Sequence, residues 1–145
     1  MPFPTQCTVS GSQKIVSLKE NGRSFIIRNI SGTRLTRVRF DGCVINNIPG
    51  QLSCDYGLWI ENSSAAHFIE LKGTDIKHAC AQIAATIDFV KQNHADQMTG
   101  RSLHAAIVAS AIKAPKLKQS SQYVKLRKLV SSPVEIKNGK LEIEV

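Results

Sequence analysis

Three charged residues accompany two neighbouring apolar runs in the middle of the chain. Asp55 precedes the run Tyr56-Gly57-Leu58-Trp59-Ile60, and Glu70 and Lys72 end the next one. Because Glu70 and Lys72 are two positions apart, both side chains point to the same face of a strand, while Leu71 points to the opposite face. The pattern therefore predicts a charged pair displayed from an otherwise hydrophobic strand.

A polar turn of hairpin length, Glu61-Asn62-Ser63-Ser64, separates the two runs. A hairpin folded about this turn places Asp55 opposite Glu70 or within one residue of it. A slip of one residue would instead turn Asp55 to the other face of the sheet. In the first register, two carboxylates and one ammonium group converge.

The chemistry open to such a group is phosphodiester hydrolysis. Two facing carboxylates repel each other unless a cation neutralises them, and oxygen ligands suit a hard ion such as Mg²⁺. That ion would polarise a phosphodiester and help to generate hydroxide. Lys72 would hold or deprotonate the attacking water and stabilise the charge that grows on the phosphate.

The order of these residues resembles the signature of the PD-(D/E)XK, or restriction-endonuclease-like, nuclease superfamily. The match consists of Cys54-Asp55, a strand-length gap, Ile69-Glu70-Leu71-Lys72 and a following helix, and its region covers about Asp41 to Val90. The resemblance implies a mixed sheet flanked by helices, a requirement for Mg²⁺ or Mn²⁺, and cleavage of nucleic acid, DNA before RNA. By position, it makes Asp55 and Glu70 the metal ligands and Lys72 the catalytic lysine.

Three further residues are candidates for supporting roles in this resemblance. Gln82 resembles a glutamine that some of these nucleases carry in the helix after the E-x-K strand. An additional acidic residue often comes from an early helix; Glu20 is the best candidate here, and Asp41 is an alternative on the preceding strand. The chain departs from the signature in having no proline before Asp55.

The charge of the chain favours a polyanionic partner. Nineteen Lys and Arg against eleven Asp and Glu give a net charge of +8, which favours nucleic acid first and anionic membrane second. A purely solvated basic surface is the plainer alternative. In the nucleic-acid interpretation, one basic tract holds the phosphate backbone without selecting sequence, namely Arg101, Lys113, Lys116, Lys118, Lys125, Arg127 and Lys128.

A length of 145 residues predicts one domain, residues 1–145. We expect an α/β fold with a mixed sheet built around the hairpin of residues 54–72. Two helices are expected to pack on it, one over about 75–91, which Thr74 can cap, and a basic one over about 119–130.

Other segments carry weaker signals. Two strands are expected between Ser24 and Ile45, and the run from Leu103 to Ala109 indicates a strand beside the hairpin, although its alanines leave a helix open. Residues 134–145 are predicted to form a closing hairpin turned at Asn138-Gly139. The segment before Gly22 fits either a short helix or an edge element.

Several classes of protein are disfavoured. The N-terminus lacks the features of a secretory signal, and no apolar stretch has membrane-spanning length. We therefore expect a cytoplasmic protein that is not associated with a membrane. The cysteines form no C-x-x-C pair, and free, partly buried thiols are expected at Cys7, Cys43, Cys54 and Cys80. The histidines show no metal-ligand spacing, and Trp59 is expected in the core.

The partners and the alternatives follow from these features. So small a nuclease, without a separate recognition domain, is expected to form a homodimer or to join a larger complex, in DNA repair or phage defence for example. One alternative is a catalytically inactive nucleic-acid-binding or assembly module of the same fold. Another is a basic RNA-binding protein of unrelated fold, in which Asp55 and Glu70 would lie far apart. In the plainest alternative, Glu70 and Lys72 form an exposed salt bridge.

Overall fold

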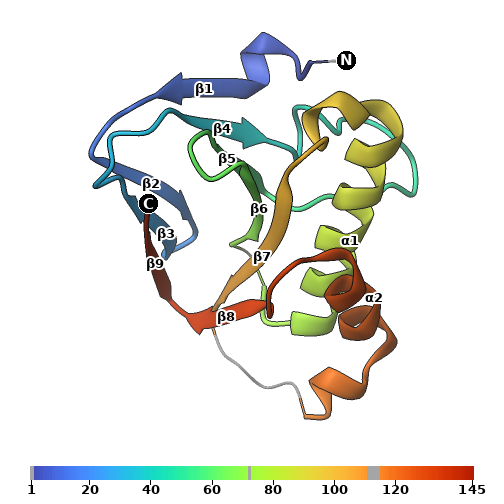
Figure 1. Cartoon of the computed structure of the whole chain (residues 1–145). Coiled ribbons are helices and arrows are strands. Elements are labelled where there is room, and N and C mark those ends of the chain that lie inside the picture. The colour runs from blue at the N-terminus through green and yellow to red at the C-terminus, as the bar shows by residue number, and fades with distance from the viewer. Residues whose placement is uncertain (1, 72, 111–114) are drawn as a thin grey trace.

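A computed structural model of the chain describes residues 2–71, 73–110 and 115–145, so the predictions made for Lys72 and Lys113 lie outside the described residues. The described residues form one α/β domain with a mixed sheet and two helices (Figure 1). The six-stranded sheet has the order β1-β4-β5-β6-β7-β8, and a three-stranded sheet has the order β2-β3-β9. The strands are β1 (Thr8–Gly11), β2 (Ile15–Glu20), β3 (Arg23–Arg28), β4 (Leu35–Arg39), β5 (Tyr56–Ile60), β6 (Ala65–Glu70), β7 (Ser102–Ala109), β8 (Glu135–Asn138) and β9 (Lys140–Glu144). The helices are α1 (Ile76–Asn93) and α2 (Ser121–Leu129), with short 3₁₀ turns η1 (Thr5–Cys7), η2 (Ala95–Gln97) and η3 (Leu117–Gln119).

The large sheet is mixed because its connections differ in length. The β5–β6 hairpin turns within a few residues and pairs antiparallel, with Tyr56 opposite Ile69. After β6 the chain crosses over through α1, so β7 pairs parallel to β6, with Glu70 opposite Ile107. The hairpin and the strand at 103–109 were both expected from the sequence, and the structure confirms them.

The two faces of the large sheet are covered differently. Ala66 and Phe68 of β6 point to the core beneath α1, whereas Ala65 and Ile69 point to a second core shared with the three-stranded sheet. Figure 1 shows α1 and α2 on one side and β2, β3 and β9 on the other. The expectation of helices on the sheet is therefore confirmed for one face only, because a second sheet covers the other face.

Helix α1 has an apolar face and a capped start. Its buried residues recur at helical spacing and include Ile76, Ala79, Ile83 and Ile87. The side chain of Asp75 caps the helix by accepting the main-chain N–H of His78 at 3.0 Å. The cap therefore lies one residue beyond the predicted Thr74.

The core beneath α1 is rich in aromatic rings. Phe40 stacks on Phe68 with ring centroids 5.6 Å apart, and Trp59 meets Phe68 edge-on at 5.6 Å. A Cβ atom on Gly57 would approach both Phe40 and Trp59 to 2.6 Å, so only glycine fits in β5 at this position. Trp59 is buried, and its Nε1 donates to the Gln97 carbonyl at 2.9 Å, which confirms the core assignment.

The C-terminal hairpin prediction is wrong. β8 and β9 do not pair with each other: β8 lies parallel to β7 at the edge of the large sheet, and β9 lies parallel to β3 in the small one. Gly139, with φ +77°, turns the chain between the two sheets rather than back on itself. Only β8, at residues 135–138, extends the sheet that carries Glu70.

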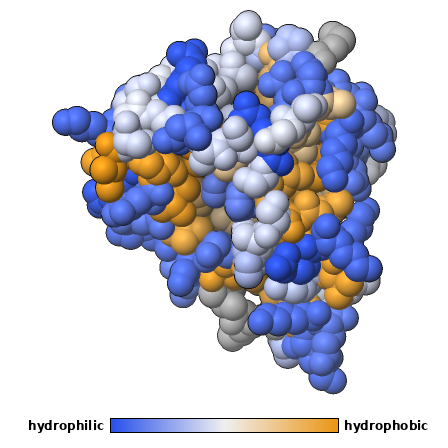
Figure 2. Space-filling view, in the orientation of Figure 1, coloured by the Kyte–Doolittle hydropathy of each residue, from blue (hydrophilic) through white to orange (hydrophobic). Residues whose placement is uncertain are grey.

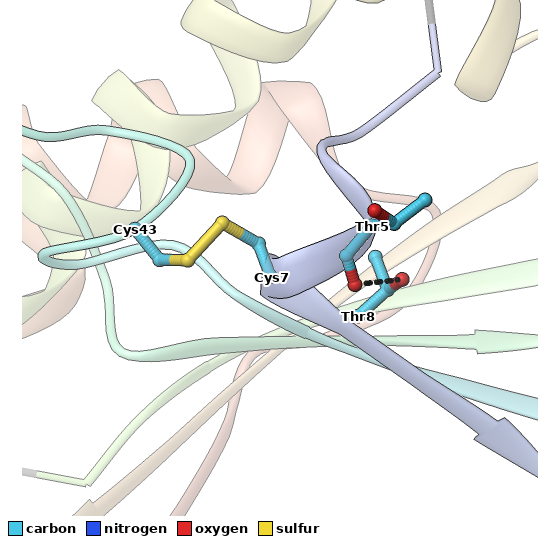
Figure 3. The surroundings of a disulfide bond; sticks show 4 residues. All are labelled: Thr5, Cys7, Thr8 and Cys43. Atoms are coloured by element: carbon cyan, nitrogen blue, oxygen red, sulfur yellow. Dashed lines mark hydrogen bonds between the residues drawn. A yellow bond between two sulfur atoms is a disulfide. The ribbon is translucent and has the colours of Figure 1, made fainter.

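The prediction of four free thiols is wrong for two of them. Cys7 and Cys43 form a disulfide with a Cα–Cα distance of 5.7 Å, which ties the turn at residues 5–7 to the loop after β4 (Figure 3). Cys54 and Cys80 are free and buried, as expected. Cys7 and Cys43 are 36 residues apart in the sequence, so no local pattern indicated that they would form a disulfide.

Within the described residues, no helix is long and apolar enough to cross a membrane. Figure 2 shows a mostly hydrophilic face, with hydrophobic residues visible mainly on the β2–β3 side at the left and around α1 at the right.

Candidate metal-binding site

The structure brings Asp55 and Glu70 together at one end of the β5–β6 hairpin. The main-chain N–H of Asp55 donates to Oε1 of Glu70 at 3.1 Å. The main-chain N–H of Leu71 donates to Oδ2 of Asp55 at 2.9 Å. Each carboxylate is therefore oriented by a hydrogen bond from the opposite strand.

The hairpin adopts the register that turns both carboxylates to the α1 side. Tyr56 lies opposite Ile69, so continuing the ladder by one residue sets Asp55 opposite Glu70. By the alternation of a strand, Asp55 shares the face of Gly57 and Glu70 shares the face of Phe68, beneath α1. Both carboxylates are buried, with Asp55 5% and Glu70 1% exposed.

Two polar residues of α1 hold the segment that leads into Asp55. Gln82 Nε2 donates to the Ser53 carbonyl at 3.3 Å, and Thr86 Oγ1 accepts the main-chain N–H of Cys54 at 2.8 Å. Gln82 and Thr86 are four residues apart and therefore lie on the same face of the helix. Gln82 thus supports the site through the backbone before Asp55, which is a positioning role.

Thr86 is a site residue that the sequence analysis missed. Its hydroxyl accepts the Cys54 N–H and donates to the Gln82 carbonyl at 2.8 Å, so both of its roles are satisfied although it is fully buried. One signal in the sequence could have indicated its role: a hydroxyl residue lies between the apolar positions Ile83 and Ile87, on the buried face of the predicted helix.

The two carboxylates act on the pKa of the neighbouring Cys54 thiol. Burial raises the pKa of the Cys54 thiol, and the charges of Glu70 and Asp55 raise it further, while a hydrogen bond with Thr86 opposes them. Cys54 is therefore held as a neutral thiol at neutral pH in the metal-free protein. The ionisable oxygen donors at this position are the carboxylates.

Asp41 and Glu20, the candidate additional acids, lie in different places. Asp41 directly precedes the turn after β4, and its Oδ1 accepts the hydroxyl of Ser53 at 2.9 Å, two residues before Asp55. Glu20 ends β2, on the three-stranded sheet that covers the opposite face. Among the described residues, no group of three or more His, Cys, Asp or Glu side chains is arranged to hold a metal ion.

The predicted phosphate-binding tract is spread over several elements. Arg101 immediately precedes Ser102, the first residue of β7, whereas Glu70 lies opposite Ile107 of the same strand. Roughly 16 Å of strand separates Ser102 from Ile107, so Arg101 lies at the end of the sheet away from Glu70. On α2, Lys125 forms an ion pair with Asp88 of α1 at 3.2 Å, and Arg127 donates to the Val130 carbonyl at 3.2 Å. The others described are exposed: Lys116, Lys118 and Lys128.

The histidines take no part in the carboxylate pair. His78 is exposed in the first turn of α1. His67 and His104 stack at 4.7 Å on the opposite face of the sheet, where His104 contacts the hydroxyls of Ser102 and Ser132. Burial lowers the pKa of His67 to about 4, so that its ring is neutral at pH 7.

No family model, curated protein or solved structure matches this chain. The functional argument therefore depends on the geometry of the site.

Proposed function

We propose that the protein is a metal-dependent nuclease that hydrolyses phosphodiester bonds, DNA before RNA. The observation that carries the proposal is the buried pair formed by Asp55 and Glu70, joined through the Asp55 N–H at 3.1 Å. Such a pair followed by α1 agrees with the order of elements in the PD-(D/E)XK signature. The mixed sheet agrees with it as well, although helices cover one face of that sheet and a second sheet covers the other.

The two carboxylates lie close together within a hydrophobic layer. Asp55 and Glu70 lie beside Cys54 and Phe68, which are completely buried. Two like charges held side by side in a buried layer repel each other, and a cation beside them relieves this repulsion. Buried acidic pairs of this kind cluster at functional sites.

The donor set suits Mg²⁺ or Mn²⁺, with Asp55 and Glu70 as the protein ligands. An ionised carboxylate offers about four lone-pair positions, and the N–H bond described at each of Asp55 and Glu70 occupies one of them. Magnesium is commonly bound by one or two carboxylates and several waters, which fits a pair rather than a cage. When bound, the ion supplies Lewis-acid activation of the phosphate and of water.

The remaining roles follow from neighbouring residues. Lys72, two positions after Glu70 in the sequence, is assigned to orient the attacking water and to stabilise negative charge on the phosphate. Gln82 and Thr86 fix the backbone that carries Asp55. A net charge of +8 favours association with nucleic acid. We further propose a homodimer, or a subunit of a larger complex, in the cytoplasm.

The test is cleavage of plasmid, linear duplex, single-stranded DNA and RNA in Mg²⁺, Mn²⁺ or EDTA. The native protein is compared with Glu70→Ala and Lys72→Ala, with folding checked by circular dichroism. Metal-dependent cutting that both substitutions abolish is the expected result. Absence of cutting under every condition, with nucleic acid still bound, would favour the inactive binding module instead.

A further inference from the structure

A basic cleft lies between the large and small sheets, on the face opposite α1. Its wider part encloses about 440 Å³, and a narrower continuation encloses about 160 Å³. Val9, Ser17 and Arg37 line both parts, so the two form one continuous cleft between β1 and β4 on one side and β2 on the other. We call this the Arg37 cleft.

Three cations line the wider part of the Arg37 cleft. Arg37 and Arg39 are two positions apart on β4 and therefore share the face that turns away from α1, while Lys19 comes from β2. The lining includes no carboxylate. Within the described parts of the chain, these three cations form no ion pair with an acidic residue. Three positive charges gathered around one concave surface favour an anionic ligand.

Tyr56 is the residue of the Arg37 cleft that lies nearest to the carboxylate pair in the chain. It lines the cleft opposite Arg39 and directly follows Asp55 in the chain. By the alternation of β5, the Tyr56 side chain points to the cleft side of the sheet, whereas Asp55 points to the α1 side.

We propose that the Arg37 cleft binds phosphate groups of a nucleic-acid strand. The inference rests on the proposed nuclease function and assigns the strand a contact surface outside the tract of residues 101–128. Arg37 and Arg39 present forked donors that match phosphate oxygens, Lys19 adds a point charge, and the Tyr56 hydroxyl can donate to a phosphate oxygen. The cleft contacts read no base edges, so binding here is independent of sequence.

The test is fluorescence anisotropy of labelled single-stranded and duplex 20-mers, measured in EDTA so that no cleavage occurs. The variants are Arg37→Gln/Arg39→Gln and the exposed Lys19→Gln, with melting temperature as the folding check. Lys91→Gln/Lys137→Gln removes the same charge from exposed positions on α1 and β8 and is the matched control. Unlabelled AMP, as a competitor, distinguishes a small phosphorylated ligand from a strand.

The expected result is binding at least about 10-fold weaker in the arginine double variant, with the slope of log affinity against log salt reduced by about 1.4 to 1.8. Lys19→Gln should also weaken binding, and the control pair should change it less than 2-fold, roughly, since its charges lie outside the lining of the cleft. Variants that bind like the control, while the native protein still binds and cuts, would overturn the proposed role of the cleft and leave the proposed nuclease activity unaffected.

If AMP competes at the same phosphate concentration, the ligand of the cleft is a small phosphorylated molecule and not a nucleic-acid strand. A native protein that binds no nucleic acid would overturn the cleft, and the separate cleavage assay would then decide the nuclease.

Discussion

The main-chain N–H of Asp55 lies 3.1 Å from Oε1 of Glu70, and this hydrogen bond joins the two strands at the point where both acidic residues are buried. The carboxylate of Glu70 thus has a structural partner in the backbone of the residue with which it is proposed to share a metal ion. Substitutions that keep the acceptor oxygen but remove the charge therefore separate folding from activity.

Glu70→Gln should retain the fold and lose the activity. The glutamine Oε1 still accepts the Asp55 N–H, while removal of one charge relieves repulsion between the carboxylates, so the free energy of unfolding in EDTA should fall by no more than about 1 kcal/mol. Cleavage in Mg²⁺ should fall at least about 100-fold, the scale of losing one electrostatic group at a reacting centre. The measurements are urea unfolding and plasmid cleavage, with Glu135→Gln on β8 as the exposed control.

Metal ions should stabilise the native protein. A ligand that binds only the folded state at 100 times its dissociation constant adds about 2.7 kcal/mol. The melting temperature should therefore rise when Mg²⁺ or Mn²⁺ replaces EDTA, and the rise should disappear in Asp55→Asn and in Glu70→Gln. A rise of equal size in these variants would show that the ion binds elsewhere.

Thr86→Val should weaken both stability and activity. It keeps the shape of the side chain but removes the acceptor of the buried Cys54 N–H, which costs about 1 to 3 kcal/mol. Since Cys54 precedes Asp55, cleavage should fall as well, while Thr86→Ser, which keeps the hydroxyl, should restore most of both. Equal activity in the valine and serine variants would argue against a positioning role for Thr86.

Reduction of the Cys7–Cys43 disulfide should destabilise the protein. The bond closes a loop across a 36-residue separation, and in the chain-entropy description such a loop adds about 4 kcal/mol. Disulfides persist in oxidising surroundings and are rare in the cytosol, so in the proposed cytoplasmic location the bond is expected to be reduced. Thermal melts with and without a dithiol, compared with Cys7→Ser/Cys43→Ser, measure the loss; a double variant that responds to the dithiol would contradict the assignment.

Stability should rise with pH between about 4 and 6.5. Burial lowers the pKa of His67 to about 4 from an ordinary 6.5, so in this window the unfolded chain binds more protons than the folded one. Folding is therefore penalised increasingly as pH falls through 6.5, and the penalty is complete below about 4. Since His67 is half-buried, we expect a difference of about 2 kcal/mol, seen by urea unfolding. His67→Gln should flatten the profile, whereas the exposed His78→Gln should not.

Local signals in the sequence were enough to predict the part of the fold that carries the carboxylates. A short polar turn between two apolar runs determined the hairpin, and helical periodicity predicted α1 to within two residues at its C-terminal end. The register was left open because alternation alone does not distinguish pairings one residue apart. The Asp55 and Leu71 hydrogen bonds show the arrangement with both carboxylates on the α1 side.

Features that depend on distant pairing were beyond the sequence. Asn138-Gly139 has the composition of a hairpin turn, yet β8 and β9 gain partners in separate sheets because β7 and β3 present open edges. The Cys7–Cys43 bond and the second sheet over the His67 face likewise depend on residues far apart in the chain. The contact of Thr86 with Cys54 joins a helix to a segment 32 residues earlier.

The most direct test of the proposed site is the initial rate of plasmid cleavage in Mg²⁺ by the native protein, Asp55→Asn, Glu70→Gln and the control Glu135→Gln at equal concentration. If Asp55 and Glu70 hold the catalytic ion, the native protein and Glu135→Gln cut at similar rates, both lose cutting in EDTA, and the two site variants are at least about 100-fold slower. Cutting by the folded site variants at the native rate, or no cutting by the native protein on any nucleic acid, would contradict the account.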